Sequence, residues 1–412
     1  MSANSPFTTR LMRFAAAIGP GLVVMLADTD AGSVITAAQS GAQWGYRLLL
    51  LQFMIIPLLY IVQELTVRLA LCTGKGYAEL IVQHFGKGLA ILSLATLGIS
   101  CLGALVTEMS GLAGVGQLFG LPVWQTIGVV VGLLLIMVVT GSYQSVERIA
   151  IFLGVFELAF LPVAWKAAPD LHIVAAQVRQ LPLHDKSYLY LIAANLGTSV
   201  MPWTVFYQQS AMIDKGLNLR HLRAARLDTL FGAILCQGVT AAVLIAAAAA
   251  FSGHDAGLQL DSVAQIADAL TRVLGRDVGR ILFALALSGG ALVATIVVCL
   301  SASWALGEVL GIRHALEKHP AEVPWFYITF ALLLCAGGAL VSSGVNLVRL
   351  SIATAVVNAV LLPVVLGVLY MLARRHLPAA HRLSGRYAWV VGCLFALTGA
   401  LGLYSGVVGA LG

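Results

Sequence analysis

Charged residues are scarce in this chain. Only 10% of its 412 residues are Asp, Glu, Lys or Arg, whereas 60% are hydrophobic and the mean hydropathy is +0.94. Soluble domains carry about 25% charged residues. The composition therefore excludes a soluble globular protein and predicts an all-α protein that crosses a membrane many times.

Cysteine and histidine are also few, and their positions exclude several kinds of site. The six cysteines are scattered through apolar segments without a CxxC spacing, which argues against a disulfide framework or a thiolate metal cluster. The nine histidines fall in expected loops or at expected helix ends. We therefore expect no histidine-based proton relay or metal site inside the bilayer.

Hydrophobic runs long enough to span a bilayer, about 20 residues each, recur along the whole chain. Eleven such runs lie at about 11–46, 48–71, 89–117, 123–142, 148–167, 188–213, 227–252, 279–310, 325–343, 347–373 and 387–411. With the N-terminus in the cytoplasm, most of the 24 Lys and Arg residues fall in cytoplasmic segments, as the positive-inside rule requires. Topology thus explains the net charge of +6, so no nucleic-acid partner is expected. The two long external loops, after the fifth and seventh runs, are each expected to hold a short amphipathic helix.

Two of these spans are interrupted by polar residues that do not continue a helix. The first span contains Asp28-Thr29-Asp30-Ala31-Gly32-Ser33, and the sixth contains Thr198-Ser199-Val200-Met201-Pro202-Trp203-Thr204. Unwound backbone is tolerated at membrane depth only where it is buried or lines a cavity. Paired interruptions, one in each half of a chain, are typical of a secondary transporter with its substrate site at the middle of the membrane.

The positions of the interruptions also predict the architecture. Spans 1–5 and 6–10 are expected to form two repeats of opposite orientation, which is the 5+5 inverted repeat of the leucine-transporter fold. The expected division is 1–167 for helices 1 to 5, 168–187 for an external loop, 188–374 for helices 6 to 10, and 375–412 for an additional helix 11.

Asp30 is the principal candidate ligand in the first interruption. Its carboxylate can cap the second half of the broken helix and bind a cation at the same time. Asp28 would point away from Asp30 on a continuous helix, but the two can converge where the helix is unwound, unless Asp28 pairs with a neighbouring helix. Two carboxylates in one cavity favour a divalent cation.

The second interruption offers oxygen and sulfur ligands. Pro202 removes a backbone donor and leaves the carbonyls of Thr198 and Ser199 without full helical partners. Met201 provides a thioether that suits manganese or iron more than magnesium, although a lone methionine is usually a packing residue. Thr204, Ser33, Gln208 and Gln209 are candidates to hold the water molecules of a partly hydrated ion, a state that Mg²⁺ favours.

Other intramembrane polar residues have alternative interpretations. Glu64 and Arg68, one helical turn apart, are expected to form an ion pair. Glu108 in the third span and Glu157 in the fifth have no local partner, so each either neutralises a basic group on another helix or belongs to a permeation path. Hydrogen bonds between helices are expected for Asn195, Gln237 and Asn358.

The motifs around the two interruptions resemble those of the Nramp family of divalent-metal transporters. Gly19-Pro20-Gly21, Asp30-Ala31-Gly32-Ser33 and Gly41-Ala42-Gln43-Trp44-Gly45-Tyr46 are similar to the family's first span with its DPGN signature. Thr73-Gly74-Lys75 with Ala78-Glu79-Leu80 resembles the segment after the second span, and Met201-Pro202-Trp203-Thr204 stands where the family has MPHN. The resemblance runs from about residue 15 to the end.

Several positions depart from the family pattern. Ser33 replaces the DPGN asparagine, and Trp203 and Thr204 replace the MPHN histidine and asparagine. The family's second histidine falls at Gln208 or Gln209, its third-span aspartate at Leu105 and its tenth-span glutamine at Ala355. The resemblance implies that these groups serve metal coordination and proton movement in ordinary members, so their loss argues against proton coupling.

With the extra Asp28, this set of changes most resembles the Nramp-related magnesium transporter branch. The resemblance implies a wider site that handles Mg²⁺ and Mn²⁺ and admits a partly hydrated ion. The retained Met201 points the other way, toward selectivity for softer metals.

The resulting prediction is an importer of Mg²⁺ or Mn²⁺ that works by alternating access, without proton coupling. Asp30, Ser33, Met201 and the Thr198 carbonyl would hold the ion, with Asp28 and Thr204 as outer contributors. The transported ion is the substrate, and neither a cofactor nor an enzymatic reaction is expected. The protein is expected in the plasma (inner) membrane, surrounded by the lipid bilayer, as a monomer or a weak dimer.

Three alternatives remain open from the sequence. The first is a proton-coupled Mn²⁺/Fe²⁺ importer. The second is a sodium-coupled amino-acid or amine transporter of the same fold, although Asp28 and Asp30 would repel a substrate carboxylate. The third is a membrane metal sensor that does not transport.

Overall fold

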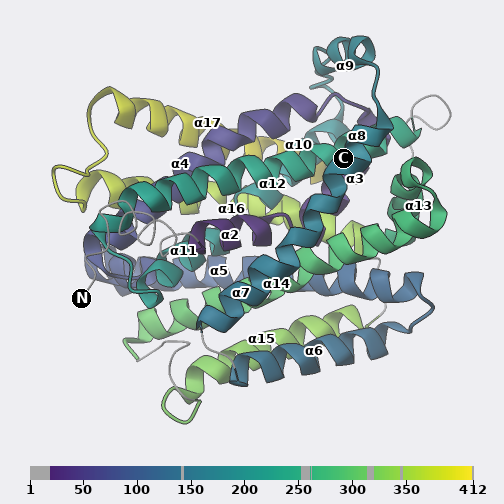
Figure 1. Ribbon diagram of the computed structural model, residues 1–412. Helices are drawn as coiled ribbons and strands as arrows, with labels where there is room; N and C mark the ends of the chain where they lie inside the picture. The colour runs from purple at the N-terminus through teal and green to yellow at the C-terminus, as the bar shows by residue number, and fades with distance from the viewer. Residues whose placement is uncertain are drawn as a thin grey trace, which may run out of the picture.

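A computed structural model describes residues 19–140, 143–251, 260, 262–312, 320–343 and 347–410, which are helical apart from short connections (Figure 1). The expected start of the first span at residue 11 lies outside the described residues, as do Arg10, Arg13, Arg313, Lys318 and three of the histidines, His254, His314 and His319. The elements are α2 (Pro20–Asp28), α3 (Ala31–Trp44), α4 (Leu49–Thr73), α5 (Tyr77–Leu118), α6 (Val123–Thr140), α7 (Tyr143–Gly154), η1 (Val155–Ala159), α8 (Phe160–Ala167), α9 (Leu171–Val178), α10 (Lys186–Ser199), α11 (Pro202–Asp214), η2 (Leu219–His221), α12 (Leu222–Phe251), α13 (Val263–Leu274), α14 (Arg276–Leu310), α15 (Pro324–Val341), α16 (Leu347–Arg375) and α17 (Gly385–Ala410).

The number of spans agrees with the sequence. Within the described residues, ten helical segments are long and apolar enough to cross a membrane, and the bent pair α2 and α3 makes an eleventh. The third span agrees with its expected range of about 89–117. Gly86, with φ of 82° and ψ of 173°, breaks the helical path of α5, so a short helical arm from Tyr77 precedes the spanning part. Both long connections contain a short helix, as expected, and α13 is amphipathic, whereas α9 has no buried residues.

The first span is broken because its residues terminate one helix and start another. Pro20, which lacks an N–H group, begins α2, and the helix ends at Asp28. Thr29 leaves helical geometry with φ of −85° and ψ of 49°, and Asp30 is extended and caps α3. The axes of α2 and α3 differ by 46°.

The sixth span is broken in the same manner. α10 ends at Ser199, Val200 leaves helical geometry with φ of −127° and ψ of 83°, Met201 is extended, and Pro202 starts α11 as its first residue. A proline cannot donate a backbone hydrogen bond to the preceding turn, so the helix cannot run through this point. Both interruptions expected from the sequence are therefore present.

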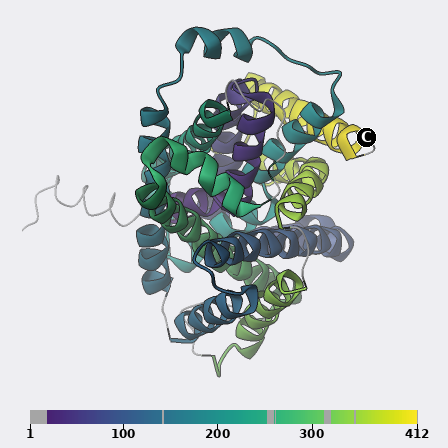
Figure 2. The same cartoon turned by 90° about the vertical axis from the view of Figure 1, so that its right-hand side faces the viewer.

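The broken spans occupy the middle of the bundle. In the most apolar window of the α10–α11 segment 94% of the residues are buried, against 22% in that of α6. α6 and α15 lie side by side along one flank of the molecule, whereas α2 lies among α12, α14 and α11 (Figure 1, Figure 2). α6 exposes large apolar side chains such as Trp124, Leu133 and Ile136, which suits a surface that faces lipid.

Close packing around the broken spans depends on glycine. A β-carbon at Gly41 would lie 2.4 Å from the carbonyl oxygen of Leu244 in α12, and one at Gly197 would lie 1.7 Å from that of Ala355 in α16. Small residues allow transmembrane backbones to approach each other closely. This packing fixes α3 against α12 and α10 against α16.

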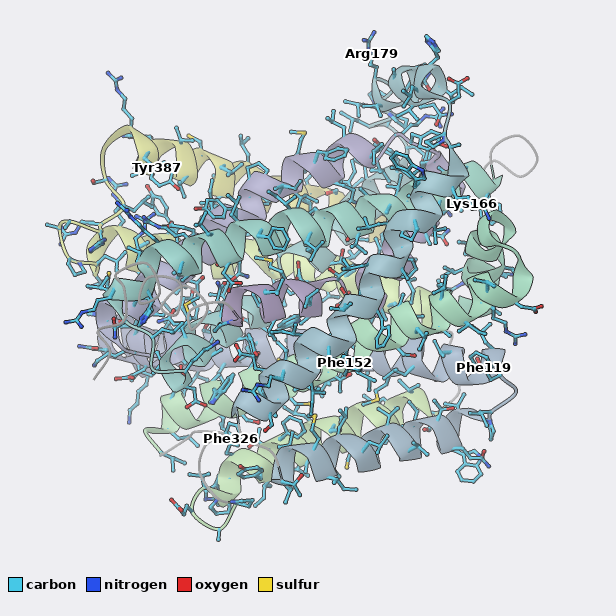
Figure 3. All side chains as sticks on the ribbon, in the orientation of Figure 1. Phe119, Phe152, Lys166, Arg179, Phe326 and Tyr387 are labelled. Carbon is cyan, nitrogen blue, oxygen red and sulfur yellow. The ribbon has the colours of Figure 1, made fainter. Side chains whose placement is uncertain are left out.

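The two ends of the bundle differ. Phe119, Lys166 and Arg179 lie at the end that carries α9 and α13, and Tyr387 and Phe326 lie toward the opposite end (Figure 3). The α16–α17 connection is also at the end of Tyr387. The predicted topology makes the α9 and α13 end external.

Candidate binding site at the two helix breaks

Asp30 lies at the first break and is almost fully buried, with 2% of its surface exposed. Its Oδ1 accepts a hydrogen bond of 2.7 Å from the backbone N–H of Ser33, so it caps α3 as expected. Glu108 of α5 reaches the same helix start, where its Oε2 accepts a bond of 3.0 Å from the N–H of Ala31. Two carboxylates therefore share the positive N-terminal end of α3.

Ser33 connects the two broken spans. Its hydroxyl oxygen lies 2.8 Å from the carbonyl oxygen of Asp28 and 3.4 Å from that of Thr198. Both carbonyls come from helix ends, where a full set of helical partners is lacking. The sequence expected Ser33 and Thr198 to share a site, and the structure brings them together.

The Thr198 carbonyl owes its availability to Pro202, which has no N–H to donate. The hydroxyls of Thr198 and Ser199 turn back to the carbonyl of Asn195, at 3.2 and 2.8 Å. The carbonyl oxygen of Thr198 is thus the group that faces Ser33, and its side chain is engaged within its own helix.

The Met201 sulfur is close to another partner in the same span. The indole Nε1 of Trp203 donates to it over 3.2 Å, and both side chains are buried. Thr204 donates its hydroxyl to the backbone carbonyl of Met201 over 2.8 Å. The indole contact uses one face of the sulfur and reduces its capacity to bind a soft metal.

Asp28 is also buried, with 1% of its surface exposed. Its Oδ2 lies 3.6 Å from the Cys236 sulfur of α12, and its Oδ1 has no hydrogen-bond partner among the described residues. The ion pairs found in the described chain include neither Asp28 nor Asp30. Negative charge at the break is therefore not cancelled by a lysine or arginine there.

Gln208 and Gln209 are bound elsewhere. The Gln208 amide nitrogen donates to Thr229 over 2.9 Å, and that of Gln209 donates to the Lys75 carbonyl over 2.7 Å. Neither makes a hydrogen bond to Asp30 or Ser33 within the described residues. Their expected role in holding water molecules at the site stays a prediction.

The remaining polar predictions have mixed outcomes. Glu64 and Arg68 form the expected ion pair, which Arg226 of α12 joins. Asn195 links helices through Ser40 and Gln52. Gln237 instead contacts Cys236 of its own helix, and the amide oxygens of Gln237 and Asn358 have no partner among the described residues.

The sequence could not predict two contacts of the site. For Glu108 it allowed either neutralisation of a basic group or a place in a permeation path, and only the fold shows that Glu108 reaches the N-terminus of α3. The sequence assigned no site to Cys236, but its sulfur lies 3.6 Å from Asp28 Oδ2. Both residues lie in apolar stretches of sequence that do not indicate these contacts, because the contacts depend on how α5 and α12 pack against the break.

A cavity of about 460 Å³ lies toward the end that carries α9 and α13. Gln39 and Gln43 of α3, Tyr190 and Leu191 of α10 and Arg349 of α16 line it with others. The Ser40 and Asn195 pair lies next to this lining, and none of the candidate site residues at the breaks lines the cavity.

The opposite end of α2 is held by hydrogen bonds. Asp228 of α12 accepts through Oδ2 from the N–H groups of Gly19, Gly21 and Leu22, at 3.2, 2.9 and 3.2 Å. A carboxylate is favoured at a helix N-terminus because the free N–H groups converge there. This contact attaches the N-terminal end of α2 to α12.

The donor atoms at the breaks are mainly oxygens, with the Met201 sulfur at the second break. Among the described residues, no three His, Cys, Asp or Glu side chains converge as a metal site of those ligands requires. The oxygens at the breaks come instead from the Asp30 carboxylate, with Glu108 at the same helix start, from the Ser33 hydroxyl and from the backbone carbonyls of Asp28 and Thr198. Such oxygen ligands favour Mg²⁺, Ca²⁺ or Mn²⁺.

Comparisons with known proteins give a consistent relationship. A family model described as natural resistance-associated macrophage protein-like, Nramp, matches residues 21–407. The chain is 29% identical over 305 residues to the divalent metal cation transporter MntH of Ralstonia nicotianae, covering 68% of this chain and 66% of that protein. It is 30% identical over 300 residues to MntH 1 of Pseudomonas aeruginosa, covering 67% and 66%. The chain thus spans 66% of the length of these two relatives.

Solved structures show the same fold. A manganese transporter of Eremococcus coleocola, crystallised with an aromatic bis-isothiourea compound, superposes with a TM-score of 0.76 at 18% identity, covering 100% of this chain and 90% of that one. MHP1, a nucleobase-cation-symport-1 family transporter, superposes with a TM-score of 0.62 at 13% identity, covering 96% and 90%. The predicted fold, with interrupted first and sixth spans, is confirmed.

Proposed function

Because the chain belongs to the Nramp family, we propose that it carries divalent metal cations across a membrane by alternating access. The relatives named above are described as divalent metal cation transporters, and a structural neighbour as a manganese transporter. The process exchanges ligands around an ion and makes no covalent bond, so no enzymatic step is involved.

One observation carries the proposal: Ser33 joins the two breaks beside the buried Asp30 carboxylate. Ser33 lies within hydrogen-bond distance of the carbonyls of Asp28 and Thr198, and its N–H binds Asp30. A carboxylate at membrane depth without a basic partner is costly, and a bound cation offsets that cost. The same position places carbonyl oxygens from two separate helices around the ion.

We propose that Asp30, Ser33, the Thr198 carbonyl and Met201 contact the ion, with Asp28 and Thr204 contributing at longer range. Asp28 supports this assignment because one of its carboxylate oxygens has no partner among the described residues. Thr204 bonds to the carbonyl of Met201 and so fixes the turn that presents the sulfur.

Mg²⁺ and Mn²⁺ are the proposed substrates. The indole of Trp203 already contacts the Met201 sulfur, which leaves the oxygen ligands dominant. Mg²⁺ keeps several of its waters and needs few protein ligands. Mn²⁺ accepts oxygen ligands and tolerates a thioether.

Transport is proposed to be import and to run without proton coupling. The positions that carry proton-handling groups in ordinary members, as the resemblance implies, hold Leu105 and Ala355 here, and both are buried apolar residues. The cavity toward α9 and α13 supports entry from outside if the N-terminus is cytoplasmic. The two rivals, a proton-coupled Mn²⁺/Fe²⁺ importer and a sodium-coupled amino-acid or amine carrier, are separated from this proposal by the experiment below.

The moving parts are proposed to be the two five-helix repeats, 1–167 and 188–374, with 375–412 as an additional helix. The breaks allow α2 and α11 to tilt relative to α3 and α10. The protein is proposed to act in the plasma (inner) membrane as a monomer or weak dimer.

Uptake of Mn²⁺, Mg²⁺ and Ca²⁺ into proteoliposomes tests this function directly. Asp30→Ala should abolish Mn²⁺ and Mg²⁺ uptake because it removes the carboxylate that lies next to Ser33 between the two breaks. The control is Asp170→Ala, since Asp170 is also an N-cap aspartate but caps the external helix α9. Wild-type uptake by Asp30→Ala would refute the assignment.

The same vesicles separate the rivals. A pH-sensitive dye inside them should report no acidification tied to Mn²⁺ entry. Acidification in proportion to the metal would support the proton-coupled rival. Uptake of amino acids with no response to divalent metals would support the other.

A further inference from the structure

A groove of about 540 Å³ lies between α16 and α17, the last two spans, which pack against each other (Figure 2). Its lining is apolar for the most part and includes Leu366 and Gly367 of α16 and Cys393, Ala396 and Leu403 of α17. None of the residues that line it belongs to the proposed metal site. Because both helices are long and apolar enough to cross a membrane, the groove faces the hydrocarbon of the bilayer.

Small residues shape the groove. A β-carbon at Gly392 would lie 3.1 Å from the hydroxyl oxygen of Tyr370, and one at Gly399 would lie 3.3 Å from Cγ of Pro363, so α16 and α17 touch at these two points. At Gly367, in contrast, a β-carbon would meet nothing within 4 Å. The two helices therefore approach closely, and the absent side chain at Gly367 leaves free space beside their contact.

The groove has the length and the position of one leaflet. Its lining runs along α17 from Trp389 to Leu403, which is about 21 Å at about 1.5 Å per residue. Half of a hydrocarbon core is about 15 Å thick. Trp389 is 73% exposed and lies toward the α16–α17 connection, which is cytoplasmic in the predicted topology, and tryptophan is enriched at membrane interfaces. The groove thus extends from the inner interface into the bilayer.

Arg374 stands at the interface end of the groove, one turn after Tyr370, which lines it. The Nη1 of Arg374 donates to the Tyr370 hydroxyl over 3.0 Å, and its guanidinium carbon lies 5.8 Å from the centre of the same ring. The Tyr370 hydroxyl donates in turn to the carbonyl of Ala388 in α17 over 3.2 Å. These contacts hold a positive charge at the place where the two helices meet.

Arg386 supplies a second positive charge from the opposite wall. It precedes Trp389 by three residues and Cys393 by seven, so it lies on the same face of α17 as the lining of the groove. Arg374 and Arg386 are both exposed, and the ion pairs found in the described chain include neither of them. An apolar groove that ends in two arginines suits a ligand with an apolar chain and an anionic head.

We propose that an anionic phospholipid of the inner leaflet binds here, with an acyl chain in the groove and its phosphate between Arg374 and Arg386. Arginine binds phosphate oxygens through strong charge-assisted hydrogen bonds. Basic pockets between transmembrane helices on the cytoplasmic side bind anionic head groups. A second copy of this chain fits the groove less well, because a two-fold axis along the membrane normal would bring the arginines of both copies together. The site does not depend on which ion the protein transports.

Native mass spectrometry of the purified full-length protein tests the two charges, with phosphatidylglycerol and phosphatidylcholine of the same acyl chains as the probes. Wild-type protein should bind phosphatidylglycerol about tenfold more tightly than phosphatidylcholine. The double variant Arg374→Gln with Arg386→Gln should bind both lipids with the weaker affinity. Its control is Arg148→Gln with Arg220→Gln, which removes two exposed arginines of the predicted cytoplasmic side, on α7 and η2. The control should keep the wild-type preference.

Gly367→Leu tests the groove itself. The new side chain enters the free space beside α16, and leucine favours a helix more than glycine does, so the variant should fold. Its affinity for phosphatidylglycerol should fall about fivefold or more, because the acyl chain loses its place. Gly132→Leu is the matched control, since a β-carbon at this position of α6 also meets nothing within 4 Å and lies outside the groove. Melting temperatures of both variants at or above that of wild type would show that a filled groove causes the loss.

Four results would overturn the proposal. The first is equal affinity of wild-type protein for the two lipids, or an equal loss of preference in the two double arginine variants. The second is unchanged phosphatidylglycerol binding by Gly367→Leu. The third is displacement of phosphatidylglycerol by the same concentration of glycerol 3-phosphate, which would identify a phosphate site without a lipid chain. The fourth is a dimer that excludes phosphatidylglycerol and that Gly367→Leu dissociates, which would identify a second copy as the occupant.

Discussion

The hydroxyl of Ser33 lies 3.4 Å from the carbonyl oxygen of Thr198, although 165 residues separate them in the chain. This contact joins the break of the first span to the break of the sixth. It places a side-chain oxygen and a backbone oxygen next to the carboxylate that caps α3.

Ser33→Ala should weaken divalent binding without unfolding the protein. The substitution removes a hydroxyl whose hydrogen bonds are worth about 0.5–1.5 kcal/mol, which corresponds to a loss of affinity of about two- to tenfold. Concentration dependence of Mn²⁺ uptake measures this change. Ser301→Ala is the control, since the buried Ser301 hydroxyl bonds only to the Val297 carbonyl of its own helix in the described structure. If both variants show the same concentration dependence of Mn²⁺ uptake, Ser33 does not bind the ion.

Trp203→Phe should make the transporter more selective for Mn²⁺ over Mg²⁺. The change removes the indole N–H that contacts the Met201 sulfur and keeps an aromatic ring in a buried position. The freed thioether favours the softer ion. Competition of unlabelled Mg²⁺ against radioactive Mn²⁺ measures the preference, and we expect it to shift by about threefold to tenfold, or 0.6–1.4 kcal/mol by the usual conversion. The double variant Trp203→Phe with Met201→Leu should return to the wild-type preference between Mn²⁺ and Mg²⁺. An unchanged preference in Trp203→Phe would contradict the role of the contact between Trp203 and Met201.

Gly290→Ala should destabilise the protein, because its new methyl group would meet the Thr29 carbonyl at 2.5 Å. Overpacking of this kind costs about 1–3 kcal/mol. Thermal unfolding in detergent measures the effect. Gly238→Ala in α12 is the matched control, since nothing lies within 4 Å of the position that its β-carbon would take. That helical substitution should be neutral or slightly stabilising, and equal melting temperatures for the two variants would argue against close packing at Gly290.

Asp228→Ala should release the N-terminal end of α2 from α12. The carboxylate accepts from three backbone N–H groups, and removal of an N-terminal capping group costs about 0.5–2 kcal/mol. A cysteine placed at Met25, now buried, should then be labelled faster by a membrane-impermeant thiol reagent applied to the side of the α16–α17 connection. The same cysteine in the otherwise wild-type protein is the reference. An unchanged labelling rate would show that Asp228 does not hold this end closed.

Acid should destabilise the contact between His84 and His376. Their rings stack with centroids 3.7 Å apart, and burial, with the nearby charges of His84, Arg375 and Arg382, lowers the pKa of His376. A histidine with a lowered pKa in the folded state binds its proton more readily when unfolded. Stability contributed by the neutral ring is therefore present above the unfolded pKa of about 6.5 and is lost as the pH falls below it. Melting temperatures at pH 5.5 and 7.5 should differ less in His376→Gln than in wild type, and an equal pH dependence would contradict this assignment.

The sequence predicted the parts of the fold that local chemistry determines. Polar residues with an N-cap aspartate at Asp30, and Pro202 beside polar residues in the sixth run, mark the two breaks, whereas Pro57 and Pro363 stand in wholly apolar surroundings and lie inside continuous helices. The start of α5 at Tyr77 could not be derived. The polar residues near Gly86 do not resemble a membrane span, and the short helix before Gly86 forms because the tertiary structure supports it.

The candidate site was predictable to the same extent. Asp30, Ser33 and Thr198 follow from their places at the breaks, and the contact between the breaks follows from the paired architecture. Other contacts at the site depend on how each helix is rotated and packed, and residue spacing and composition do not determine this. They are the contact of Trp203 with Met201, the hydrogen bonds of Gln208 and Gln209, and the position of Glu108 at the start of α3.

Anomalous X-ray scattering at the manganese edge, from crystals soaked in Mn²⁺, tests the central claim most directly. The account predicts one peak within coordination distance of the Asp30 carboxylate, between Ser33 and the carbonyl of Thr198, and its disappearance in Asp30→Ala crystals. A peak that persists in that variant, or that lies only at residues outside the two breaks, would contradict the account.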